Sequence, residues 1–120
     1  LLTKIIAAMR LTRETVYIGN IVKCRPPNNR NPEPEEIRQC LPFLKRQLAV
    51  INPRVICALG SVAARALLNT KTPISRLRGR FYEFSGIPVM PTFHPAYLLR
   101  NPEKKRDVWE DVQKIMKMLE

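Results

Sequence analysis

Three short apolar runs, separated by segments with helical spacing, constrain the fold of this chain more than any other feature. The runs cover residues 16–22, 54–59 and 87–93. Short runs without polar alternation are typical of parallel strands covered on both faces. Between the first two runs, apolar residues recur at helical steps on one stripe: Ile37, Leu41, Leu44, Leu48 and Ile51. Strands that alternate with helices predict an α/β layer architecture with a parallel sheet between helices.

The other segments fit this architecture. Helices are predicted over residues 1–10, over residues 62–68, and from about Glu103 to the end of the chain. The first of these helices has no capping residue before it, which suggests that it is already under way where the chain begins. Residues 70–84 are basic and are predicted to be irregular.

Charge gives the first indication of a partner. The chain has 120 residues and a formal net charge of +11, from 21 Lys and Arg against 10 Asp and Glu. This imbalance favours a polyanion, with nucleic acid ahead of an anionic membrane surface. No apolar run approaches the roughly 20 residues that span a bilayer, and no signal-peptide pattern is seen. We therefore expect a cytoplasmic protein of one domain, without a membrane partner.

The only histidine lies between prolines at the end of the third run. Pro95 follows His94 directly, and the prolines around it hold the backbone extended. The imidazole is therefore predicted on a stiff loop at a strand's carboxyl end, where open α/β sheets bind ligands. A lone histidine is often a bystander. Here Leu98, Leu99 and Arg100 follow it, a combination suited to unstacking a nucleobase and gripping the backbone around it.

The cysteines and one asparagine are the other candidates for chemistry. Cys57 lies within an apolar run and is most simply a core residue. Cys24 is predicted in a proline-rich loop after a strand, and Cys40 in the first turns of the following helix. Two cysteines on short rigid segments suit thiolate ligation of zinc or an iron–sulfur cluster, although two cysteines are half a site. Asn20 is predicted near a strand end. Its amide either caps a turn or matches a pyrimidine edge that presents N3–H and O4, which would reject cytosine.

Four motifs point further. Residues 16–27, 40–44, 55–60 and 88–100 closely resemble, in the same order, the iron–sulfur uracil-DNA glycosylases of family 4. The resemblance implies a sheet of four parallel strands between helices, a [4Fe–4S] cluster, and hydrolysis of the glycosidic bond of uracil in DNA. The implied substrate is uracil-containing DNA, and the complete protein is expected to be a monomer.

The resemblance also implies roles for single residues. Asn20 would read the uracil edge and His94 would hydrogen-bond O2, so both are predicted as catalytic and substrate-binding residues. Cys24 and Cys40 would be two of the four cluster ligands. Leu98 falls where related enzymes insert a leucine into the gap left by the flipped base. The basic residues proposed to contact DNA phosphates are Lys23, Arg25, Arg30, Arg78, Arg80 and Arg100.

Several family features are missing from this sequence. Two cysteines, a Gly-Glu-x-Pro-Gly segment that positions the attacking water, and the phenylalanine that stacks on uracil would all lie upstream. Residues 1–120 are therefore expected to be an N-terminally truncated domain that lacks its first strand, has little or no activity and holds no intact cluster alone. Two alternatives remain open: a nucleic-acid-binding α/β module without catalysis, and a small metal or redox protein that uses Cys24 and Cys40.

Overall fold

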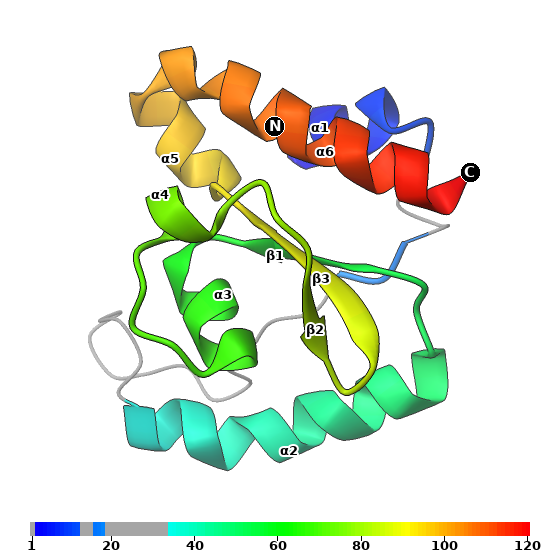
Figure 1. Cartoon of the computed structure of the whole chain (residues 1–120), viewed down its shortest axis with the longest axis vertical. Coiled ribbons are helices and arrows are strands. Elements are labelled where there is room, and N and C mark those ends of the chain that lie inside the picture. The colour runs from blue at the N-terminus through cyan, green and yellow to red at the C-terminus, as the bar shows by residue number, and fades with distance from the viewer. Residues whose placement is uncertain (1, 13–15, 19–33) are drawn as a thin grey trace.

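A computed structural model describes residues 2–12, 16–18 and 34–120 of this protein. These residues form six α-helices, three strands and one 3₁₀ helix (Figure 1). In chain order the elements are α1 (Leu2–Ala8), α2 (Pro34–Ile51), β1 (Ile56–Leu59), α3 (Ser61–Leu68), α4 (Ile74–Leu77), β2 (Tyr82–Phe84), β3 (Ile87–Thr92), α5 (Pro95–Arg100), η2 (Pro102–Lys104) and α6 (Lys105–Leu119).

The three described strands form one sheet in the order β1-β3-β2. β1 and β3 are parallel, and their register pairs Ile56 with Val89 and Leu59 with Thr92. β2 runs antiparallel to β3 through a tight hairpin. Both hairpin residues, Ser85 and Gly86, have positive φ values, of 52° and 81°, as a two-residue type I′ turn requires.

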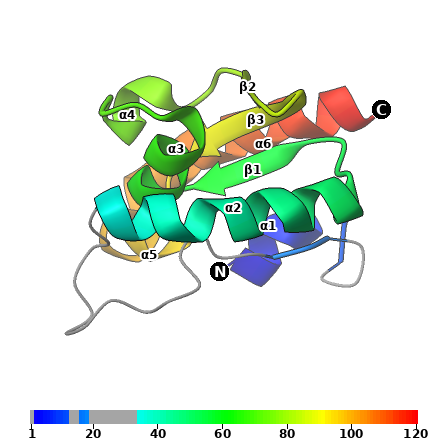
Figure 2. The same cartoon turned by 90° about the horizontal axis from the view of Figure 1, so that it is seen from below.

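Helices cover both faces of this sheet, so the described elements form three layers (Figures 1 and 2). α2 and α3 lie on one face and α1 and α6 on the other. Each face has its own apolar cluster, which is why the strands read as continuous apolar runs rather than as alternating ones. The buried residues on the α2–α3 side are Leu44, Leu48, Ala58, Ala64, Leu67, Leu77, Phe84 and Val89. Those on the α6 side are Phe93, Leu98, Val108 and Val112.

The predicted fold class is confirmed, with a parallel β1–β3 pair between helices. The expectation of an irregular segment over residues 70–84 was wrong, because this segment contains α4 and the antiparallel strand β2. The sheet is therefore mixed rather than wholly parallel. The predicted strand over residues 16–22 is only partly open to comparison: residues 16–18 are not in a strand, and the rest lie outside the described residues.

Among the described residues, none of the helices combines the length and apolar character needed to traverse a bilayer.

Candidate active site

The candidate site lies at the shared end of β1 and β3. Because the two strands are parallel, the turns that follow them meet at one edge of the sheet. A hollow of about 370 Å³ opens there. Its lining comes from the end of β1, the start of α3 and α4, the two residues after β3, and α5: Leu59, Gly60, Ser61, Val62, Ile74, Phe93, His94, Ala96, Tyr97 and Arg100. His94 lies beside this hollow, after the carboxyl end of β3, which is the place that the sequence predicted for it.

His94 is the N-cap residue of α5, and a hydrogen bond within this cap orients its imidazole. Its backbone is extended (φ −70°, ψ 143°), as the following Pro95 favours. Its Nδ1 atom accepts a hydrogen bond from the backbone N–H of Ala96 at 3.0 Å. A neutral imidazole whose Nδ1 accepts carries its proton on Nε2. The exposed ring therefore has an Nε2–H group available to donate to a ligand in the hollow.

Gly60 allows the end of β1 to approach His94 closely. Its φ is +91°, and a Cβ atom added there would lie 3.0 Å from the Cβ of His94. The Gly60 N–H donates to the carbonyl of Thr92 at 2.8 Å, which joins the two strand ends. A glycine is needed here both for the backbone conformation and for the space.

Aromatic rings form an apolar wall beside the imidazole. The Phe93 and Tyr97 rings stack with centroids 4.9 Å apart and an interplanar angle of 25°. Phe93 is buried, whereas Tyr97 is partly exposed. The hollow therefore combines an apolar wall with one fixed hydrogen-bond donor, as ligand sites commonly do.

The two leucines of α5 point in opposite directions. Leu98 is 1% exposed and packs with Val108 and Val112 of α6 in the core, whereas Leu99 is 71% exposed. The prediction that Leu98 enters the DNA is therefore wrong for this structure. The reason is that α5 begins at Pro95, and its helical phase turns Leu98 inward and Leu99 outward.

Arg78 is paired with a buried carboxylate, so its guanidinium is not available to bind a phosphate. Its Nε and Nη2 atoms donate to the two oxygens of Asp111 at 3.0 and 2.8 Å. Burial alone would lower the pKa of Arg78, but the hydrogen bond and charge of Asp111 outweigh it and raise that pKa. We therefore withdraw Arg78 from the predicted phosphate contacts. Arg80 and Arg100 are exposed, and Arg100 lines the hollow with His94.

The structure does not describe the side chains of the two predicted cluster ligands. Cys24 lies outside the described residues, as do Asn20, Lys23, Arg25 and Arg30, and Cys40 is described only as part of the α2 backbone. Among the side chains that are described, no three His, Cys, Asp or Glu residues gather as metal ligands would. Burial, with a smaller effect of the Asp111 charge, raises the pKa of the Cys57 thiol to about 12, which opposes thiolate ligation. The described residues therefore do not by themselves fit a four-thiolate cluster.

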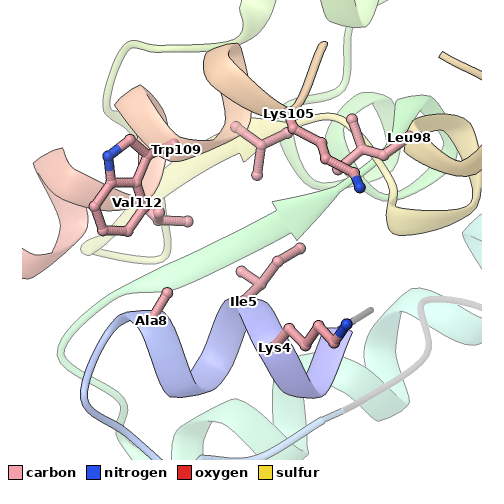
Figure 3. Close-up of a pocket in the computed structure, with 8 residues that line it drawn as sticks. Lys4, Ile5, Ala8, Leu98, Lys105, Trp109 and Val112 are labelled. Carbon is pink, nitrogen blue, oxygen red and sulfur yellow. The ribbon is translucent and has the colours of Figure 1, made fainter. Parts of the chain in front are cut away.

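A second hollow, of about 150 Å³, lies between α1 and α6 (Figure 3). Its lining is apolar apart from two lysines: Lys4, Ile5, Ala8, Leu98, Lys105, Val108, Trp109 and Val112. These side chains include no carboxylate, imidazole or hydroxyl, so the only titratable groups in this lining are the two lysine amines, whereas the first hollow has an imidazole.

Sequence reasoning missed two polar residues that support the site. The hydroxyl of Thr92 donates to Asp111 at 2.6 Å, and both residues are fully buried. A signal for Asp111 was present in the sequence, because this acid interrupts the apolar stripe formed by Val108, Val112 and Ile115 of α6. An acid at such a position is buried only when it is paired.

Comparison with known proteins identifies relatives over nearly the whole chain. The family model described as "Uracil DNA glycosylase superfamily" matches residues 1–113. The chain is 48% identical to the type-4 uracil-DNA glycosylase of Thermotoga maritima, with 95% of this chain and 62% of that protein covered. It is 43% identical to the type-4 enzyme of Archaeoglobus fulgidus, with 96% and 62% covered. The chain thus spans about three fifths of the length of these relatives.

Proposed function

Because the chain belongs to the uracil DNA glycosylase superfamily, as its motifs predicted, we propose that it serves base-excision repair by hydrolysing the N-glycosidic bond of uracil in DNA. The observation that carries this proposal is the hydrogen bond from the Ala96 N–H to Nδ1 of His94. It leaves an Nε2–H donor in the lining of a hollow that also contains the stacked Phe93 and Tyr97 rings. A donor of this kind can stabilise the negative charge on a departing uracil.

His94 would act on the leaving group. As the glycosidic bond breaks, negative charge develops on uracil, and a donor fixed at O2 stabilises it. One such preorganised donor contributes about 3 kcal/mol in comparable sites. A neutral imidazole suits this role, because its donor is already oriented by Ala96 before the base arrives. Asn20 is proposed to hydrogen-bond the N3–H and O4 edge and to exclude cytosine.

Uracil must first leave the base stack, which costs a few kcal/mol. We assign the wedge to Leu99, since Leu98 is occupied in the core. Arg80 and Arg100 are the exposed arginines proposed to hold phosphates, together with Lys23, Arg25 and Arg30. The net charge of +11 supports a DNA partner, and a monomer is the proposed binding form.

The [4Fe–4S] cluster rests on the resemblance to family 4 alone. Cys24 and Cys40 are proposed as two of its ligands. When bound, a cluster held by Cys24 and Cys40 would serve a structural role, and no catalytic step is assigned to it. Its test is the visible iron–sulfur absorbance of anaerobically purified protein, which should be lost in Cys24→Ala and kept in Cys57→Ala. If the band persists in Cys24→Ala, Cys24 is not a ligand.

The decisive experiment is excision of uracil from a labelled oligonucleotide. Two proteins should be compared: this chain, and a chimera in which the upstream part of the Thermotoga maritima relative precedes it. We expect little or no excision by the chain alone, and excision by the chimera that falls by about two orders of magnitude in His94→Ala. An oligonucleotide with thymine in place of uracil is the control substrate.

A second candidate function is DNA binding without base excision, which the net charge of +11 also supports. A basic α/β module could bind DNA without excising a base. If the chimera binds the oligonucleotide but leaves uracil in place, this second function is correct and the glycosylase proposal fails.

A further inference from the structure

A buried polar network joins the end of β3 to α6 and to the segment that follows α4. Asp111 is at its centre and is fully buried. It accepts one hydrogen bond from the Thr92 hydroxyl at 2.6 Å and two from the Arg78 guanidinium, at 3.0 and 2.8 Å. Arg78 Nη2 also donates to the Asp107 carbonyl at 3.1 Å. Both carboxylate oxygens of Asp111 are therefore satisfied.

This network holds the last residues before His94. The Thr92 hydroxyl is bound to Asp111, and its carbonyl accepts from Gly60 at 2.8 Å. The Arg78 guanidinium lies 6.0 Å from the centroid of the Phe93 ring. The side chains of Thr92 and Phe93 are thus both contacted by residues outside β3, and His94 is the next residue in the chain.

Stability alone is a poor explanation for such a network. Burying an ion pair costs desolvation that its attraction barely repays, and well-packed apolar side chains of similar volume are often as stable. An apolar contact, however, does not fix the relative orientation of two elements as hydrogen bonds do. A bidentate pair, with a third donor on the same carboxylate, sets the position of β3 relative to α6 through hydrogen-bond geometry. Gly79 also makes room for it, because a Cβ there would lie 3.2 Å from Asp111 Oδ1.

We propose that Asp111 is a positioning residue, which acts through Thr92 and Arg78 to fix the end of β3 and so the place of the His94 imidazole. It does not touch the substrate. The proposal rests on the proposed glycosylase function for its effect on rate, but its effect on the imidazole is independent of that function. Small misplacement of a catalytic group lowers the rate far more than it lowers binding.

The test uses a pair of variants at Thr92. Thr92→Val keeps the shape of the side chain and removes the hydroxyl that donates to Asp111, whereas Thr92→Ser keeps the hydroxyl. We expect Thr92→Val to lower the single-turnover excision rate of the chimera about tenfold, with DNA affinity unchanged, and Thr92→Ser to retain the rate. Asp111→Asn, which weakens the pair with Arg78, should also lower the rate without changing affinity.

A second measurement does not need activity. The chain contains one histidine, so the ¹⁵N spectrum of its imidazole reports His94 directly. In the unaltered chain we expect the Nε2–H tautomer, and in Thr92→Val a mixture of tautomers, with Thr92→Ser unchanged. If Thr92→Val only lowers the melting temperature, and both the ¹⁵N spectrum and the rate measured well below it are unchanged, the positioning role is refuted. If the unaltered chimera does not excise uracil but the ¹⁵N spectrum responds, the glycosylase proposal fails and the positioning role stands.

Discussion

A Cβ atom on Gly60 would lie 3.0 Å from the Cβ of His94, so the turn after β1 and the loop after β3 touch without room for a methyl group. Gly60 also joins the two strand ends, because its N–H donates to the carbonyl of Thr92. Both the strand ends and the position of the imidazole therefore depend on this residue. The site is therefore sensitive to changes in the turn after β1, even where they leave His94 itself in place.

Gly60→Ala is expected to destabilise the fold and to displace His94. Its φ of +91° disfavours alanine, at a cost of about 1–3 kcal/mol, and the new methyl group would press on the imidazole-bearing residue. Gly86→Ala is the matched control, since its φ is +81° but nothing lies within 4 Å of the added Cβ. Chemical denaturation and excision by the chimera should show a stability loss in both variants and a rate loss in Gly60→Ala only. Equal rates in the two variants would contradict the contact's role.

Leu98→Ala should mainly lower stability, whereas Leu99→Ala should mainly lower excision. Leu98→Ala leaves a cavity in the core and should lower the free energy of unfolding by about 2–5 kcal/mol. Leu99→Ala removes an exposed side chain, so stability should change by less than about 0.5 kcal/mol. Excision from duplex DNA by the chimera should nevertheless fall in Leu99→Ala, and fall less when uracil is already unpaired. A Leu99→Ala variant with full activity on duplex DNA would exclude it as the wedge.

Ala96→Pro tests the tautomer of His94. Ala96 lies in the first turn of α5, where proline is tolerated, but proline has no N–H to donate to Nδ1. We expect a folded protein whose imidazole shows a mixture of tautomers by ¹⁵N spectroscopy and whose chimera excises uracil at least several-fold more slowly. Ala96→Ser keeps the backbone N–H and is the control. Unchanged tautomer and rate in Ala96→Pro would show that this hydrogen bond is not needed.

Arg100→Ala is expected to weaken DNA binding in a salt-dependent way. Each lost phosphate contact should lower the slope of log K against log salt by about one, irrespective of sequence. Arg54→Ala is the control, because Arg54 is also exposed but precedes β1 and therefore lies at the opposite end of that strand from the hollow. Fluorescence anisotropy titrations over a range of salt concentrations measure the slope. Equal slopes for the two variants would remove Arg100 from the interface.

Cys57 should make stability fall in alkali. The pKa of its thiol is raised from 9.0 to about 12 by burial, and then by the charge of Asp111. Above pH 9.0 the unfolded chain loses the thiol proton while the folded chain keeps it, so stability is lost between pH 9.0 and about 12 and is fully present below this window. Urea denaturation across this range should show a steeper decline for the unaltered chain than for Cys57→Ala. Parallel declines would mean that the thiol ionises equally easily in both states.

The sequence predicted the architecture because burial on both faces leaves a clear signal. The apolar runs at β1 and β3 and the helical stripe of α2 were recognised for this reason. β2 was missed, although Tyr82 and Phe84 alternate with Glu83, because three residues in a basic segment carry too little periodicity. α5 was missed in part because Pro95 was taken as a loop residue, whereas proline also suits the first turn of a helix.

Those parts of the candidate site that depend on residue type alone could be predicted from the sequence. His94 was found because it is the only histidine and follows a strand. The role predicted for Leu98 came from the motif resemblance, and a motif position does not reveal the phase of a helix that has not been recognised. Arg78 was counted as free because a charge count cannot show that a buried partner, Asp111, lies 33 residues further along the chain.

Helix α5 has one further consequence. It starts at the imidazole, ends at Arg100 and carries Leu99 between them, while Leu98 anchors it beneath. Tilting this short helix would shift the donor proposed at His94, the wedge proposed at Leu99 and the phosphate contact proposed at Arg100 together. Substitutions in this helix therefore cannot easily change DNA binding and base excision separately. Substitutions beneath Leu98, such as at Val112, should alter both at once.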